Sequence, residues 1–289
     1  MKPIKVIPYN PLLEGLAEST GDIVFAHEDG KDITLRILKP WKNDLNKDKR
    51  YPLIVFIQGS GWTFPNIGYH LPHIAQFAMA GYVVATVTHR SCNDGHPAPA
   101  FLQDVKSAIR YLRAHADEHQ IDPTRVAAWG TSSGGNTSLL LGLTADDPAF
   151  ETGEYAGEST AVQAVVDCFG PACMVDLYDH QPAELQHSNE NLLYHLAGKD
   201  PLTCRDTLAL VDPAAYVKPG RQLPPFLLLH GDADDMVAYE QSESFYHLLE
   251  KHGYSADLVR VTDAPHEDTF WSRELLEIIF AFIEKNLQL

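Results

Sequence analysis

The residues best suited to chemistry in this chain stand in a glycine- and serine-rich stretch, WGTSSGG at positions 129–135, which contains Gly-x-Ser-x-Gly centred on Ser132. Residues 125–129 have the pattern of a short strand, and residues 135–143 that of a helix. A turn this sharp between strand and helix needs small residues two positions before and after the serine, and it places the hydroxyl at the helix N-terminus. There the helix dipole and the Ser133 N–H favour a developing oxyanion. The stretch therefore predicts Ser132 as a nucleophile, since choosing Ser133 would break the glycine spacing.

A carboxylate that could serve such a serine follows a second predicted strand. A serine hydroxyl is a weak nucleophile at neutral pH unless a histidine, itself oriented by an acid, takes its proton. The stretch HGDADDMV at 230–237 follows an apolar strand pattern and contains three acids, Asp232, Asp234 and Asp235. Catalytic groups of open α/β sheets gather at this carboxyl end of the strands. The spacing alone leaves open which of the three acids is used.

Among the 14 histidines, His266 is the one whose position suits a general base. It lies in the segment DAPHE at 263–267, between the last predicted strand and the final predicted helix. Serine, acid and histidine then occur in the chain order that accompanies this serine motif.

A third segment after a predicted strand, QGSGW from Gln58 to Trp62, has the small residues that let backbone N–H groups converge on one point. A dinucleotide-binding loop is excluded, because Phe64 stands where Gly-x-Gly-x-x-Gly needs its last glycine. His70 and His73 are the nearest approach to a metal-binding pair, but Pro72 between them disfavours a regular ligand face. The sequence therefore predicts neither a metal nor an organic cofactor.

Strand and helix patterns alternate along most of the chain, which predicts an α/β fold with a mostly parallel sheet covered by helices. The expected strands are 22–28, 31–38, 53–58, 82–88, 125–129, 161–169, 225–230 and 256–261, and the expected helices are 72–80, 100–119, 135–143, 239–252 and 272–289. One domain over residues 1–289 accommodates this pattern. Residues 170–224 contain no convincing strand. A stretch of this length inside a domain is usually functional, so we expect a mainly helical cap there. The alternative is a solvated loop without a role.

The composition limits which classes of partner the protein is expected to bind. The net charge is −17, which opposes binding to nucleic acid or to anionic membranes. No apolar stretch approaches the length of a membrane span, and residues 1–16 lack the apolar core of a signal peptide. Four cysteines without paired spacing suit reduced thiols in a cytoplasmic protein. A small-molecule substrate is the expected partner.

These motifs together resemble the α/β-hydrolase superfamily, in particular the esterase and lipase group that includes carboxylesterases and relatives of hormone-sensitive lipase. The matching blocks are QGSGW at 58–62, where the family usually has HGGGW; HRSCNDGHPAPAFLQDVKSAIRYL at 89–112; WGTSSGG at 129–135; HGDADDMV at 230–237; and PHE at 265–267. They frame the chain from about residue 51 onward. The resemblance implies an α/β-hydrolase fold.

Carried over by position, the resemblance makes Ser132 the nucleophile, Asp234 the acid and His266 the base. It makes the N–H groups of Ser60, Gly61 and Ser133 the oxyanion donors.

Two residues depart from the family pattern in the first block, where Gln58 replaces the usual histidine and Ser60 the middle glycine. Because the donors are backbone groups, the oxyanion hole is expected to survive both changes. Gln58 and Trp62 are expected to border the substrate pocket.

The expected function is a serine esterase that hydrolyses short-chain acyl esters through an acyl-enzyme. Acetylated sugars or small plant-derived esters as substrates are implied by the resemblance alone. A prolyl-oligopeptidase-type peptidase shares the fold, but the first 50 residues cannot supply the propeller domain that usually accompanies it. A catalytically silent, ligand-binding member is the other alternative, although such relatives typically lose the serine or the histidine.

Overall fold

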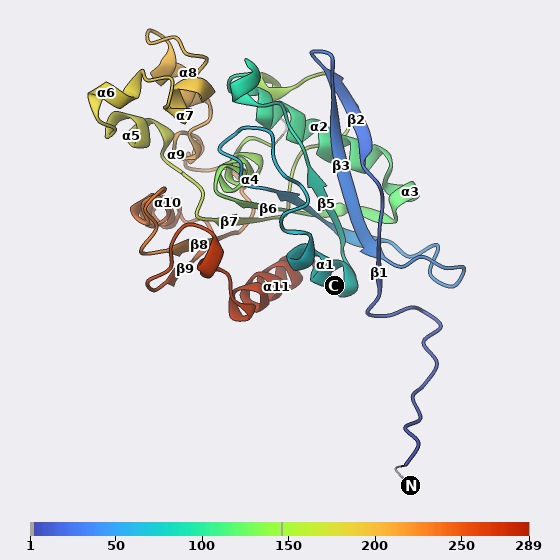
Figure 1. Ribbon diagram of the computed structural model, residues 1–289. Helices are drawn as coiled ribbons and strands as arrows, with labels where there is room; N and C mark the ends of the chain where they lie inside the picture. Colours follow the sequence, from blue (N-terminus) through green and yellow to red (C-terminus); the bar gives the residue numbers. More distant parts are fainter. Residues whose placement is uncertain (1–2, 146, 289) are drawn as a thin grey trace.

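The computed structural model describes residues 3–145 and 147–288, and its centre is a twisted, mostly parallel sheet (Figure 1). Within the described residues the sheet has nine strands in the order β1-β3-β5-β4-β6-β7-β8-β9, with β2 paired to β3. The pairs from β5 to β9 are parallel, and the pairs that β3 makes with β1, β2 and β5 are antiparallel. The strands are β1 (Ala17–Ser19), β2 (Ile23–Glu28), β3 (Lys31–Pro40), β4 (Tyr51–Ile57), β5 (Val83–Val87), β6 (Ile121–Thr131), β7 (Ala164–Cys168), β8 (Phe226–Gly231) and β9 (Ala256–Val261).

Helices cover both faces of this sheet, as Figure 1 shows. The longer helices are α1 (Leu71–Met79), α2 (Ala100–Ala114), α4 (Ser133–Thr144), α10 (Glu240–Lys251) and α11 (Arg273–Leu287). Side chains alternate along β4: Leu53, Val55 and Ile57 pack in the core under α2, α4 and α10. Ile54 and Phe56 pack on the opposite face, under α1 and α11. All five side chains are at most 1% exposed, as expected for a strand between two helical layers.

Five short helices lie between β7 and β8, at one end of the molecule (Figure 1, yellow to orange). They are α5 (Met174–Asp179), α6 (Ala183–Gln186), α7 (Leu192–Leu196), α8 (Cys204–Leu210) and α9 (Pro213–Tyr216). These helices fall in the region 170–224, where the sequence predicts a helical insertion.

The α/β fold with a mostly parallel sheet between helices is therefore confirmed. The predicted helix 100–119 is divided, because His115 leaves the helical conformation between α2 and α3 (Ala116–His119). The short strand β1 has no counterpart in the prediction, since three residues are too few to show an alternating pattern. The end of the predicted helix 272–289 includes residue 289, which lies outside the described residues.

No helix in the described part of the chain is both long and apolar enough to cross a membrane.

Candidate active site

Ser132 lies at the sharp turn between β6 and α4. Its φ of 52° and ψ of −123° fall in a region that a residue with a side chain rarely adopts. A Cβ atom at Gly130 would overlap the Gly134 carbonyl, and one at Gly134 would overlap the Ile57 carbonyl, so both positions require glycine. Helix α4 begins at the next residue, Ser133, so the Ser132 hydroxyl is held at a helix N-terminus.

Ser132, His266 and Asp234 form one hydrogen-bonded chain. His266 Nε2 lies 2.9 Å from Ser132 Oγ, and His266 Nδ1 lies 2.7 Å from Asp234 Oδ2. A carboxylate can only accept, so Nδ1 carries the proton and Nε2 is left to accept the serine proton. The Asp234 side chain is fully buried and that of His266 is 7% exposed. The sequence predicts these same three residues, and the structure brings them together.

Asp234 is held as a carboxylate by the groups around it. Burial by itself raises its pKa, but hydrogen bonding to His230 and His266 and the Val237 N–H outweighs that effect, so the pKa lies well below its ordinary value. The Met236 and Val237 N–H groups both donate to Asp234 Oδ1, at 2.9 and 2.8 Å. Asp234 therefore stays ionised in the folded protein at ordinary pH.

His230 is a supporting residue to which sequence reasoning assigns no role. It is fully buried, and its Nε2 lies 2.8 Å from the Val237 carbonyl and 3.3 Å from Asp234 Oδ2. The carbonyl can only accept, so Nε2 carries the proton and Nδ1 accepts from the Ser242 hydroxyl at 2.7 Å. The sequence signal for this supporting role is that His230 is the first residue of the motif His-Gly-Asp at 230–232, at the end of β8.

The two neighbouring acids point elsewhere. Asp232 accepts from Arg260 Nε at 2.7 Å and from the Asp263 N–H at 2.6 Å, which lowers its pKa and ties two loops together. Asp235 is exposed. Neither contacts His266.

The segment after β4 places its backbone beside Ser132, with one departure from expectation. Within the described residues, the N–H groups of Gly61 and Ser133 have no hydrogen-bond acceptor. The Ser60 N–H, predicted as a third oxyanion donor, instead donates to Ser133 Oγ at 2.9 Å. The sequence could not show this, because the bond joins two loops that are 73 positions apart.

Gln58 has a partner that explains its presence in place of the family's histidine. Its Oε1 accepts from Nδ1 of the buried His70 at 2.6 Å. On the other side, His70 Nε2 lies 3.5 Å from Glu267, the residue after His266. Burial raises the pKa of Glu267, but His70 and the Trp271 N–H outweigh it and lower the pKa. Gln58, His70 and Glu267 thus connect the two loops that flank Ser132.

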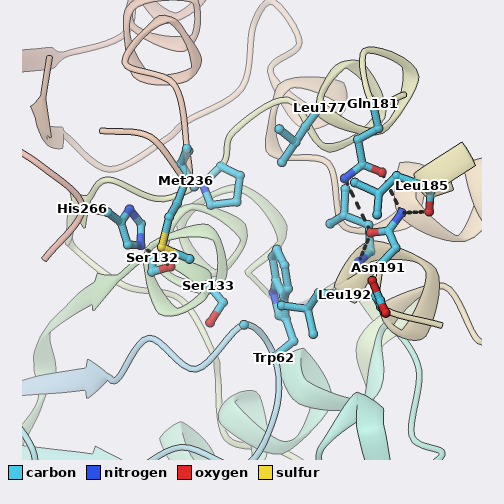
Figure 2. Close-up of a pocket in the computed structure, with 15 residues that line it drawn as sticks. Trp62, Ser132, Ser133, Leu177, Gln181, Leu185, Asn191, Leu192, Met236 and His266 are labelled. Atoms are coloured by element: carbon cyan, nitrogen blue, oxygen red, sulfur yellow. Dashed lines mark hydrogen bonds between the residues drawn. The ribbon is translucent and has the colours of Figure 1, made fainter. Parts of the chain in front are cut away.

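Two cavities open on either side of the Ser132 hydroxyl. The first, here called the apolar cavity, has a volume of about 310 Å³, and its apolar walls come from Trp62, Leu177, Leu185, Leu192, Leu193, Met236 and Val237. Figure 2 shows Ser132, His266 and Met236 at one end of it and side chains of the inserted helices at the other.

The second, here called the polar cavity, measures about 370 Å³ and is bordered by the side chains of Gln58, Asn66, Tyr69 and Glu267. Both cavities share Gly61, Ser132, Met236 and His266. Trp62 therefore borders one cavity and Gln58 the other.

No group of three or more histidine, cysteine, aspartate or glutamate side chains in the described residues is arranged to hold a metal ion.

Comparison with known proteins shows the family to which the chain belongs. A sequence model of the BD-FAE family matches residues 41–249. Esterase LipC of Mycobacterium tuberculosis is 30% identical over 222 residues, which cover 75% of this chain and 53% of that protein. The chain spans about half the length of LipC and of two further curated esterases of Mycobacterium tuberculosis that it matches.

Two solved structures share the whole architecture. A truncated carbohydrate esterase from gut microbiota superposes with a TM-score of 0.80 at 26% identity, covering 97% of this chain and all of that one. Esterase Est2 of Thermogutta terrifontis, solved with butyrate bound, gives a TM-score of 0.75 at 27% identity and covers 92% of this chain and 93% of its own. With its family pattern over more than half its length and an esterase fold throughout, this chain belongs to the BD-FAE family of α/β-hydrolases.

Proposed function

We propose that the protein hydrolyses carboxylic esters, with Ser132 as nucleophile, His266 as general base and acid, and Asp234 as the group that orients the imidazole. The observation that carries the proposal is the continuous hydrogen-bonded chain from Ser132 Oγ through His266 to Asp234. It is supported by the strained backbone of Ser132 and by the esterase names of the relatives.

The reaction uses the chain's own groups at each step. Ser132 Oγ attacks the acyl carbon while its proton passes to His266 Nε2. The tetrahedral intermediate collapses as the bond to the leaving alcohol breaks, and His266 returns that proton to the alcohol oxygen. Water, deprotonated by the same nitrogen, then attacks the acyl-enzyme and releases the acid and free Ser132. Asp234, held ionised, stabilises the imidazolium in both halves.

We assign the oxyanion hole to the N–H groups of Gly61 and Ser133. Both residues line the apolar cavity together with Ser132, and both amides lack an acceptor within the described part of the chain. Each such donor is worth on the order of 3 kcal/mol in the transition state.

The two cavities suggest how an ester lies across the site. The apolar cavity suits the acyl chain, because four leucines, Trp62, Met236, Val237 and Pro171 line it. The polar cavity suits the alcohol: both cavities reach His266, which must protonate the leaving oxygen, but only this one is bordered by the side chains of Gln58, Asn66, Tyr69 and Glu267. Its carboxylate, amide and phenol groups suit a hydroxylated alcohol such as a sugar. The butyrate-bound and carbohydrate-active relatives fit these two halves.

The four cysteines are free thiols, which fits the cytoplasmic location expected from the sequence.

Labelling with a fluorophosphonate, followed by peptide mass spectrometry, tests the nucleophile directly. We expect one adduct, on Ser132, and we expect Ser132→Ala to lose labelling and at least about 10³-fold in kcat on p-nitrophenyl butyrate. Ser133→Ala is the matched control, since it removes the neighbouring hydroxyl and should leave the adduct in place. An adduct on Ser133, or a Ser132→Ala protein that still turns over the ester, would refute the assignment.

A substrate panel tests the reaction class. We expect turnover of acetyl to butyryl esters, including acetylated sugars, and none of aminoacyl anilides. Turnover of the anilides alone would make the protein a peptidase, and tight binding of a small ester without turnover would make it a receptor.

A further inference from the structure

The residues on either side of Ser132 each present a hydroxyl to the loop that follows β4. Thr131 Oγ1 accepts from the Gly59 N–H at 2.9 Å, and Ser133 Oγ accepts from the Ser60 N–H at 2.9 Å. Two consecutive amides of the loop are thus bonded to the two neighbours of Ser132. The next amide along the loop is that of Gly61.

The loop is also closed on itself and pressed against the turn. Ser60 Oγ donates to the Thr63 carbonyl at 2.7 Å, and Thr63 Oγ1 donates to the Ser60 carbonyl at 2.6 Å. A Cβ atom at Gly59 would lie 2.7 Å from the Thr131 carbonyl oxygen and 2.9 Å from Ser132 Cβ. The two hydroxyls therefore act on a short, rigid loop at contact distance from the serine.

Because this loop is rigid, fixing two of its amides also fixes the third. Thr131 is fully buried and Ser133 is 2% exposed, so both acceptor residues are shielded from solvent. Gly61 itself has a φ of +60° and packs under Leu192, with no hydrogen bond from its own N–H in the described residues. The direction of that N–H depends on what holds Gly59 and Ser60.

We infer that Thr131 and Ser133 are positioning residues for the oxyanion hole: their hydroxyls hold the loop so that the Gly61 N–H faces the reacting carbonyl. This rests on the proposed function. It gives Ser133 two separate tasks, because its N–H donates to the oxyanion while its side chain accepts from Ser60. It also gives Ser60 a structural bond in place of the donor role that the sequence predicts.

The test compares Ser133→Ala and Thr131→Val with Thr131→Ser, which keeps the hydroxyl, and with Ser138→Ala. Ser138 is a matched control, a fully buried hydroxyl on the same helix that has no hydrogen-bond partner in the described residues. For each protein we would measure kcat and KM on p-nitrophenyl butyrate. We would also measure inhibition by p-nitrophenyl butyl ether, a substrate analogue without a carbonyl that forms no oxyanion, and by a trifluoromethyl ketone, whose adduct with Ser132 carries one.

We expect Ser133→Ala and Thr131→Val to lower kcat about tenfold and to weaken inhibition by the ketone by about the same factor. The reason is that misdirecting the Gly61 donor costs more than the loss of one ordinary hydrogen bond and less than complete removal of the donor. KM and inhibition by p-nitrophenyl butyl ether should stay within about twofold, and Thr131→Ser and Ser138→Ala should resemble the wild type. Hydrogen exchange of the peptide 57–63, which needs no turnover, should quicken only in the first two variants.

Equal losses of inhibition by the ketone and by the ether, or a loss in Ser138→Ala as large as in Ser133→Ala, would overturn the inference, because either pattern reports general damage. Unchanged kcat together with faster hydrogen exchange of the loop would also overturn the inference, but it would not affect the assignment of the catalytic triad. A wild-type protein that hydrolyses no ester would instead refute the proposed function.

Discussion

At the scale of single residues, the site depends on how each polar atom is occupied. Asp234 has one oxygen bound to two backbone amides and the other to His266. Asp232, two positions earlier, is bound to Arg260 and to the Asp263 amide. Asp232 and Asp234 lie in the same loop and are the same residue type, and they differ in role because they have different hydrogen-bond partners.

Replacing Asp234 by asparagine should reduce kcat by roughly 10⁴-fold, because the amide favours the imidazole tautomer that cannot accept the serine proton. Asp232→Asn and Asp235→Asn are the controls and should change kcat by no more than about threefold. The measurement is kcat on p-nitrophenyl butyrate together with thermal unfolding. A severe loss at Asp232 or Asp235 in a normally folded protein would move the acid to that position.

Spacing and topology predicted Ser132 and His266 from the sequence, through the glycines around Ser132 and the place of His266 after the last strand. The choice of Asp234 among the three neighbouring acids came only from the family resemblance. The hydrogen bonds that complete the site could not be predicted from the sequence. The bonds between Ser60 and Ser133 and between His70 and Gln58 are contacts that leave no local sequence pattern. His230 lies within a recognised motif, yet only the structure shows that it supports Asp234.

At the scale of elements, the strands that carry the site could be predicted more closely than the helices that cover it. β8 shows the apolar run that burial in a parallel sheet requires, whereas β9 lies at the edge of the sheet and has only half-buried and exposed residues. The predicted bounds of both strands agree with the structure to within one residue. The insertion between β7 and β8 consists of helices of four to seven residues. Pieces this short have no measurable helical period, so only their existence as a group could be expected.

Helix α7 sets one wall of the apolar cavity through Leu192, which packs on Gly61. Leu192→Ala should enlarge the cavity and shift preference toward longer acyl chains. Each additional buried methylene is worth about 0.8 kcal/mol, so the kcat/KM ratio of p-nitrophenyl hexanoate to butyrate should rise by roughly fourfold or more. Tyr69→Phe, in the polar cavity, is the control and should leave this ratio unchanged. An unchanged ratio in Leu192→Ala would place the acyl chain elsewhere.

At the scale of the whole molecule, one buried acid opposes stability at neutral pH. Asp167 lies at the end of β7 with no exposed surface, and its only hydrogen bond in the described residues comes from the Gly170 N–H. Burial raises its pKa well above the ordinary value, although the Gly170 bond works in the opposite direction. The folded chain thus keeps a proton that the unfolded chain loses above about pH 4, so this group makes stability fall as pH rises.

Asp167→Asn should therefore raise the unfolding temperature at pH 8 and have a smaller effect near pH 4. The asparagine keeps an oxygen to accept from Gly170 and cannot ionise, and each kcal/mol gained should appear as roughly 2–3 °C. Thermal unfolding of both proteins at the two pH values measures the effect. Activity on p-nitrophenyl butyrate is the control and should be retained, because Asp167 makes no contact with Ser132 or His266 in the structure. A lower unfolding temperature at pH 8 would contradict this account.

The two cavities beside Ser132 are built from different parts of the chain. The apolar cavity is walled largely by the insertion between β7 and β8, whereas the polar cavity is walled by the segment between β4 and α1 and by Glu267. If an ester binds as proposed, selectivity for its two halves is encoded in separate stretches of sequence. Exchange of the inserted helices should then alter the acid that is accepted and leave the choice of alcohol unchanged.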